Sequence, residues 1–144
     1  MIVVADTSGI IAAFDRSAPE GPTCRKLLQE AGTVILSPLV LAEVDHLARA
    51  RLGSAARTTI LDLLSTQVRR MRFQVPDIGA EILATAVAVI SRYADLDLDL
   101  ADAVSVALAA DYRTDAVLTL DRGDFRALRP LTPHAAFRLL PDDL

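Results

Sequence analysis

The chain has 144 residues, of which 52% are apolar and 24% charged, and its formal net charge is −4. Its length allows a buried core, and its composition excludes an intrinsically disordered protein. The longest charge-free runs are shorter than the roughly 18–20 residues of a membrane-spanning helix. The first residues lack the basic leader of a signal peptide, and a single cysteine, Cys24, excludes an internal disulfide. We therefore expect one domain over residues 1–144, located in the cytoplasm and not bound to a membrane.

Apolar runs and capping residues predict strands that alternate with helices along the chain. The expected strands are residues 2–5, 34–36, 71–75, 116–119 and 137–140. The expected helices begin at residue 8 and span 23–30, 38–52, 54–70, 77–93, 101–112 and a short stretch within 121–128, with Thr23, Ser54 and Asp77 as predicted caps. This alternation predicts an α/β fold, in which a parallel sheet of four to five strands lies between two layers of helices.

Two acidic residues directly follow predicted strands. Asp6 comes after residues 2–5, and Asp121 comes after residues 116–119. The carboxyl ends of parallel strands lie at one edge of a sheet, where ligands usually bind, so we expect both carboxylates at that edge. Each also has an ordinary explanation, because Asp6 can cap the helix that follows it and Asp121 can belong to a simple turn before a short helix capped by Asp124.

Two further acidic residues lie in predicted helices. Between residues 101 and 110 the only polar side chains are Asp102 and Ser105, which share one face of an otherwise apolar helix. A lone buried carboxylate is costly unless it is paired, protonated or bound to a metal, although the helix dipole would favour an acid in this first turn. Glu43 lies at the border of an apolar helical face, from which it can also reach solvent. Four carboxylates gathered in space would repel one another, so the sequence predicts a site for divalent cations.

Four segments make the sequence resemble PIN-domain ribonucleases, and most closely the VapC-type toxins of VapBC toxin–antitoxin pairs. These segments are residues 4–8 (VADTS), 37–44 (SPLVLAEV), 100–103 (LADA) and 118–125 (LTLDRGDF). The resemblance implies a PIN-like α/β/α fold and a catalytic acidic quartet of Asp6, Glu43, Asp102 and Asp121. It matches Asp124 to a further, more variable acid, and Thr7 and Thr119 to hydroxyl positions beside the quartet.

The same resemblance implies an endoribonuclease that uses Mg²⁺ or Mn²⁺, forms a homodimer and is silenced by an antitoxin whose tail fills the active-site groove. Hard oxygen ligands suit both ions. We expect Asp6 and Asp102 to be the main metal ligands, and Glu43 and Asp121 to complete the shell, orienting water or a second ion. The sequence does not distinguish transfer, ribosomal and messenger RNA as substrates.

Other functions fit the sequence less well. An aspartyl phosphatase would need a second acid two residues after the first, where Ser8 stands, and a receiver domain would need a lysine after its last core strand. A catalytically silent PIN-like module that binds RNA or acts as a scaffold remains the main alternative. Two groups of arginines could form a basic rim around the acidic centre or belong to solvated helix faces. The groups are Arg49, Arg51 and Arg57, and Arg69, Arg70 and Arg72.

Overall fold

The computed structural model describes residues 1–144 and contains a sheet of five strands, all parallel, with seven α-helices around it. The strands are β1 (Ile2–Ala5), β2 (Thr33–Ile35), β3 (Phe73–Gln74), β4 (Ala116–Leu118) and β5 (Arg138–Leu140). The helices are α1 (Thr7–Phe14), α2 (Gly21–Glu30), α3 (Pro38–Leu52), α4 (Ser54–Arg69), α5 (Ala80–Arg92), α6 (Leu100–Asp111) and α7 (Arg122–Ala127), with a 3₁₀ turn at Ala94–Leu96. None of the helices combines the length and the apolar character needed to cross a membrane.

Strand β1 lies at the centre of the sheet, whose order is β3-β2-β1-β4-β5. The chain builds outward from β1 through β2 to β3, and then returns to the other side of β1 to form β4 and β5. Val4 stands opposite Ile35 of β2 on one side and Val117 of β4 on the other. The direction of winding therefore changes between β1 and β4, which is the place where parallel sheets bind their ligands.

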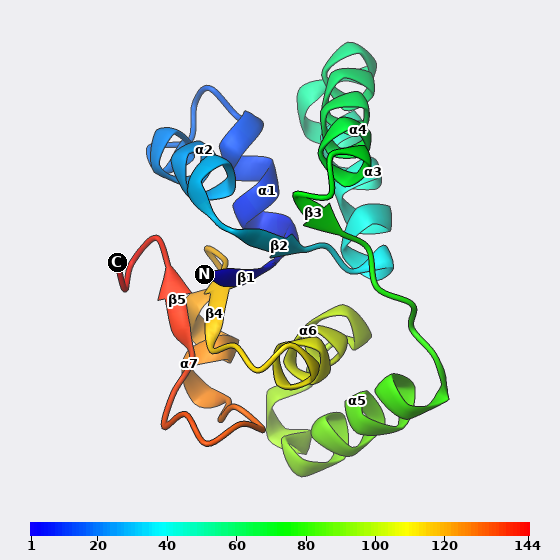
Figure 1. Cartoon of the computed structure of the whole chain (residues 1–144), viewed down its shortest axis with the longest axis vertical. Helices are drawn as coiled ribbons and strands as arrows, with labels where there is room; N and C mark the ends of the chain where they lie inside the picture. Colours follow the sequence, from blue (N-terminus) through cyan, green and yellow to red (C-terminus); the bar gives the residue numbers. More distant parts are fainter.

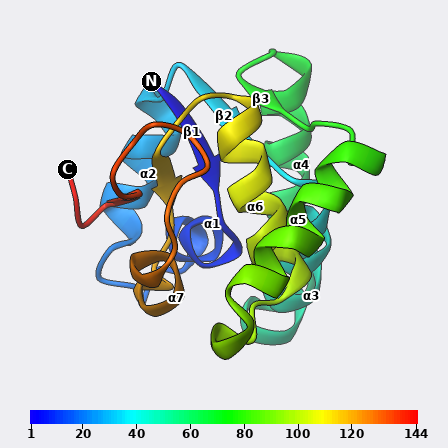
Figure 2. The same cartoon turned by 90° about the horizontal axis from the view of Figure 1, so that it is seen from below.

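Successive residues of each strand enter different cores, as the period of two in a strand requires. In β1, Val3 and Ala5 belong to a core that includes residues of α1 to α4, whereas Val4 belongs to a second core with residues of α5 and α6. Figure 1 shows the two layers on opposite faces of the sheet, and Figure 2 shows α5 and α6 side by side. The predicted α/β fold with two helical layers is confirmed.

The observed helix starts differ from several expected ones because local capping signals compete with one another. Helix α2 begins at Gly21, since Pro22 supplies a fixed helical φ in its first turn, and Thr23 is already inside the helix. Helix α5 begins after Gly79, so Asp77 does not cap it. Helix α7 begins at Arg122, which places Asp124 in the first turn instead of at the cap.

Helix α1 packs unusually close to β4. A Cβ atom added to Gly9 would lie 2.7 Å from both the Cγ atom and the carbonyl oxygen of Leu118. Only glycine allows this approach without displacing β4 or the helix. The contact brings the start of α1 against the segment that follows β4, and both segments carry residues of the predicted site.

Candidate active site

A pocket of about 310 Å³ opens beyond the carboxyl ends of β1 and β4. Its wall contains all four predicted acids together with two further ones, namely Asp6, Asp15, Glu43, Asp99, Asp102 and Asp121. Arg51 is the only basic residue in the wall. The structure therefore brings together carboxylates from five segments of the chain, and we call this depression the acidic pocket.

Asp6 is held by hydroxyl groups and does not cap α1. Its Oδ2 atom accepts hydrogen bonds from Thr119 Oγ1 at 2.8 Å and from Ser8 Oγ at 3.2 Å, while α1 has no side-chain cap. The same two hydroxyls accept hydrogen bonds from the backbone after β4. The N–H of Leu120 donates to Ser8 Oγ, and the N–H of Asp121 donates to Thr119 Oγ1, each at 2.9 Å. This network fixes Asp6 to the segment that carries Asp121.

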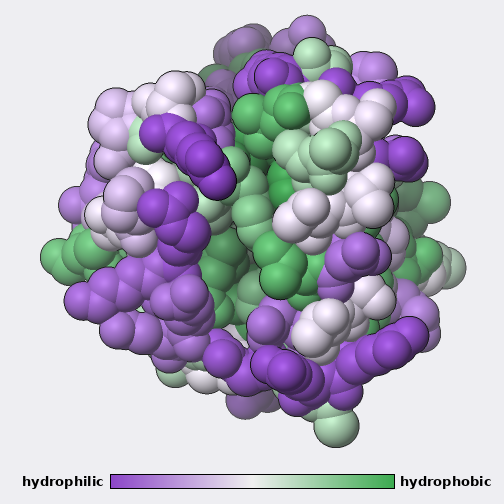
Figure 3. Space-filling view, turned by 90° about the horizontal axis from the view of Figure 1, so that it is seen from above, coloured by the Kyte–Doolittle hydropathy of each residue, from purple (hydrophilic) through white to green (hydrophobic).

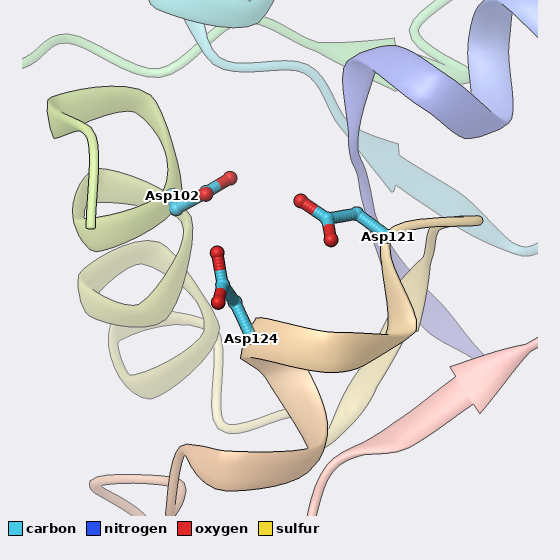
Figure 4. Close-up of side chains that lie close together, drawn as sticks. All are labelled: Asp102, Asp121 and Asp124. Carbon is cyan, nitrogen blue, oxygen red and sulfur yellow. The ribbon is translucent and has the colours of Figure 1, made fainter. Parts of the chain in front are cut away.

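Asp102 faces the two acids of the segment after β4. One carboxylate oxygen from each of Asp102, Asp121 and Asp124 lies within 4.8 Å of the others. Figure 4 shows Asp102 projecting from α6 toward Asp121 and Asp124, which stand at the start of α7. The backbone N–H of Asp102 donates to Asp99 Oδ1 at 2.9 Å, so Asp99 caps α6 and leaves the Asp102 carboxylate to the pocket.

Crowding and burial make these carboxyl groups difficult to ionise. Burial raises the pKa of Asp102 to about 8, and the charges of Asp6, Asp99, Asp121 and Asp124 add to the effect. Burial also raises the pKa of Asp6, although hydrogen bonds from Thr119 and Ser8 oppose this rise. The pKa of Asp121 is raised by partial burial and by the neighbouring charges of Asp124 and Asp99. Such mutual repulsion is relieved when a cation binds between the groups.

Glu43 of α3 also lines the acidic pocket and is half-buried. Its Oε2 atom accepts a hydrogen bond from Thr7 Oγ1 at 3.3 Å. Burial raises the pKa of this carboxyl, with a further contribution from the charge of Asp99. Glu43 and Asp6 line the pocket without belonging to the close group of Asp102, Asp121 and Asp124. The close group thus contains Asp124, which the resemblance matched only to a further, more variable acid outside the quartet.

The donor set fits a hard divalent cation. Two ligands of a single magnesium ion are at most about 4 Å apart, because each Mg–O bond is about 2.1 Å long. The three oxygens, which lie within 4.8 Å of one another, would have to move closer together to share one ion. All the donors are carboxylate oxygens, which suit Mg²⁺ and Mn²⁺ better than softer metals.

The arginine groups serve partly structural roles. Arg72 donates to the carbonyl oxygens of Leu28, Gln29 and Ala31 at the end of α2, at 3.3, 2.5 and 3.0 Å. Arg57 is paired with Asp45. Of the six arginines considered for a basic rim, only Arg51 reaches the wall of the acidic pocket.

Thr119 is expected to support the site through its hydroxyl. Replacing Thr119 by valine keeps its shape but removes the donor to Asp6 and the acceptor for the Asp121 N–H. We expect the free energy of unfolding to fall by about 1–3 kcal/mol, the usual cost of leaving buried polar groups unpaired. Thermal unfolding of Thr119→Val measures this loss, and Thr119→Ser, which retains the hydroxyl, is the control. Equal stability of the two variants would contradict the expected role.

The class of this protein is defined by its α/β/α fold and by the acidic residues gathered where the direction of winding changes between β1 and β4. The chain belongs to the PIN-domain family, whose profile matches residues 3–129. It is 34% identical over 130 residues to Ribonuclease VapC26 of Mycobacterium tuberculosis, a match covering 90% of this chain and 93% of that protein. The resemblance drawn from four short segments is confirmed over nearly the whole sequence.

Solved structures share the fold. They include VapC20 of M. tuberculosis, described as a toxin that cleaves the sarcin–ricin loop, with a TM-score of 0.73, 23% identity and coverage of 87% of this chain and 93% of that one. VapBC2 from Rickettsia felis, bound to a DNA fragment from its promoter, gives a TM-score of 0.68 and 16% identity over 92% and 96% of the chains. A toxin–antitoxin complex from Klebsiella pneumoniae gives a TM-score of 0.60 and 21% identity, with coverage of 92% of this chain and 98% of that one.

Proposed function

We propose that this protein is a divalent-metal-dependent endoribonuclease and the toxin of a type II toxin–antitoxin pair, with residues 1–144 acting as one domain. The observation that carries the proposal is the close approach of Asp102, Asp121 and Asp124, whose carboxylate oxygens lie within 4.8 Å of one another. Asp102 and Asp121 also line the acidic pocket together with Asp6 and Glu43. Membership of the PIN-domain family and similarity to Ribonuclease VapC26 support the reaction class.

In this proposal, Asp102, Asp121 and Asp124 hold the cation, with Asp6 beside them. The bound ion supplies Lewis acidity toward the phosphate and lowers the pKa of a coordinated water. Thr119 and Ser8 keep the Asp6 carboxylate in place through their hydrogen bonds. The ion is Mg²⁺ or Mn²⁺, as the oxygen donors favour.

Glu43 is assigned the role of the base that accepts a proton from the attacking water. Thr7 holds its Oε2 atom, which leaves Oε1 free to accept a proton from water as that water attacks phosphorus. The P–O bond to the leaving oxygen then breaks, the leaving oxygen takes up a proton from solvent, and Glu43 returns its proton to solvent. A carboxyl whose pKa is raised is better matched to proton transfer near neutral pH than an ordinary one.

An antitoxin is the proposed protein partner, as in the toxin–antitoxin complexes of similar fold. Figure 3 shows a groove with apolar residues between two lobes of mixed polarity. A depression of about 220 Å³ between α2 and α4 contains Phe14, Leu28, Leu63, Leu64 and Phe73, and Leu63 is 45% exposed. A peptide segment of the antitoxin with apolar side chains would cover this surface. The expected homodimer stays a prediction, which light scattering of the purified protein would test.

Metal-dependent cleavage is the direct test of the proposal. The purified protein is incubated with structured and unstructured RNA, with EDTA and then with added Mn²⁺ or Mg²⁺. We expect no cleavage in EDTA and restored cleavage when either ion is in excess. Cleavage that persists in EDTA would overturn metal dependence. Binding of RNA without cleavage under every condition would favour the catalytically silent module instead.

A further inference from the structure

We propose that the C-terminal residues Asp142 and Asp143 are positioning residues for the metal-binding carboxylates, because they tie α7 to the end of β5. This inference rests on the proposed function, since it concerns the acids assigned there to the cation. Helix α7 carries Asp124, and Asp121 immediately precedes it. Whatever fixes the orientation of this helix therefore fixes two of the three close carboxylates.

Helix α7 has few attachments of its own. It has six residues, its N-cap residue Asp121 makes no side-chain cap bond, and Phe125 is its only buried residue. Phe125 packs edge-on against Phe137, with ring centroids 6.0 Å apart. A helix this short has little stability without tertiary contacts, so the contacts along its outer face contribute to its orientation.

The C-terminal residues supply further attachments to α7 through two arginines. Arg122 and Arg126 are four residues apart and share one face of α7. Arg126 donates to both carboxylate oxygens of Asp143, at 2.6 and 2.7 Å. Arg122 donates to Asp142 Oδ1 at 3.0 Å and lies 3.8 Å from Glu20.

Asp143 is in turn fixed to the sheet. Its Oδ2 atom accepts the backbone N–H of Leu139 in β5 at 2.8 Å, and its own N–H donates to the Leu139 carbonyl at the same distance. One carboxylate thus connects the last strand to the outer face of α7. Two-point pairing between Arg126 and Asp143 also restricts rotation, which a single contact would not.

The pairing with Asp142 and Asp143 also keeps the positive charges of Arg122 and Arg126 occupied. Arg122 is adjacent to Asp121, and Arg126 is two residues from Asp124, so both cations are near the metal-binding acids in sequence. Their guanidinium groups are instead bound by Asp142 and Asp143. Asp121 and Asp124 project toward Asp102 (Figure 4). Released arginines would compete with a cation for these carboxylates.

The test compares the full chain with two charge-matched double variants. Asp142→Asn/Asp143→Asn removes the attachments, whereas Asp62→Asn/Asp111→Asn removes two exposed acids on α4 and α6 that form no ion pair. We expect Mn²⁺ affinity, measured by calorimetry, to fall about three- to tenfold in the first variant and to stay unchanged in the second. Cleavage at saturating Mn²⁺ should match the wild type, and Asp143→Glu should retain the affinity.

Amide hydrogen exchange provides a readout that needs no metal. Residues 122–128 should exchange faster in Asp142→Asn/Asp143→Asn, while β1 exchanges as in the wild type. Unchanged Mn²⁺ affinity, an equal loss in the control, or unchanged exchange in α7 would overturn the positioning role. A wild type that neither binds Mn²⁺ nor cleaves RNA would instead refute the proposed function. The exchange comparison would still decide whether Asp142 and Asp143 hold α7 in place.

Discussion

Replacing Asp102 with asparagine should abolish RNA cleavage and at the same time make the metal-free protein more stable. The substitution keeps the shape of the side chain but removes the charge that burial and four neighbouring carboxylates disfavour. We expect at least about a hundredfold loss of cleavage, because the buried member of the proposed metal-binding group is lost. The melting temperature in EDTA at pH 8 should rise by several degrees, since each kcal/mol shifts it by about 2–8 °C.

Asp111→Asn is the matched control, because Asp111 lies at the exposed end of the same helix. It should change neither cleavage nor the melting temperature in EDTA. Full activity of Asp102→Asn would refute the assignment of this residue. A lower melting temperature for Asp102→Asn at pH 8 would show that its charge is compensated within the protein.

The metal-free protein should lose stability as the pH rises from about 5 to 8. The carboxyl of Asp102 has a folded-state pKa of about 8, whereas an unfolded aspartate has one near 4. Between these values the folded protein keeps a proton that the unfolded chain has released. Stability therefore falls with rising pH, by up to about 4 kcal/mol over three pH units for one such proton. Thermal unfolding in EDTA across this range measures the change.

Saturating Mn²⁺ should oppose this loss, because the ion binds the deprotonated carboxylates of the folded state. The melting temperature with Mn²⁺ should therefore exceed that in EDTA by a margin that grows toward pH 8. The variant Asp102→Asn should show a flatter profile in EDTA than the wild type. Identical profiles for the two proteins would mean that Asp102 does not titrate between pH 4 and 8.

The placement of the acids followed from local patterns in the sequence. Asp6 and Asp121 each end an apolar strand, and parallel pairing of β1 with β4 brings these two ends to the same edge. The apolar run around Asp102 correctly predicted a buried helix, where Asp102 is 8% exposed. These predictions succeeded because strand and helix periods depend on neighbouring residues alone.

The contacts between distant residues were not predictable in the same way. Asp6 has the sequence of a helix cap, yet its carboxylate bonds to Thr119, 113 residues away. The role of Arg72 at the end of α2 and the position of Asp124 in the close group also depend on how elements pack. A single sequence shows which residues can form hydrogen bonds, but side-chain rotamers and tertiary packing decide which partners they meet.

The central position of β1 has a consequence for the synthesis of this protein. During synthesis, β1 must wait for β4, more than a hundred residues later, before its second edge is paired and Asp6 meets Thr119. A nascent or truncated chain that ends before β4 lacks Asp121 and Asp124 and has no complete pocket. The cutting centre of this nuclease can therefore assemble only after β4 and the start of α7 have been synthesised.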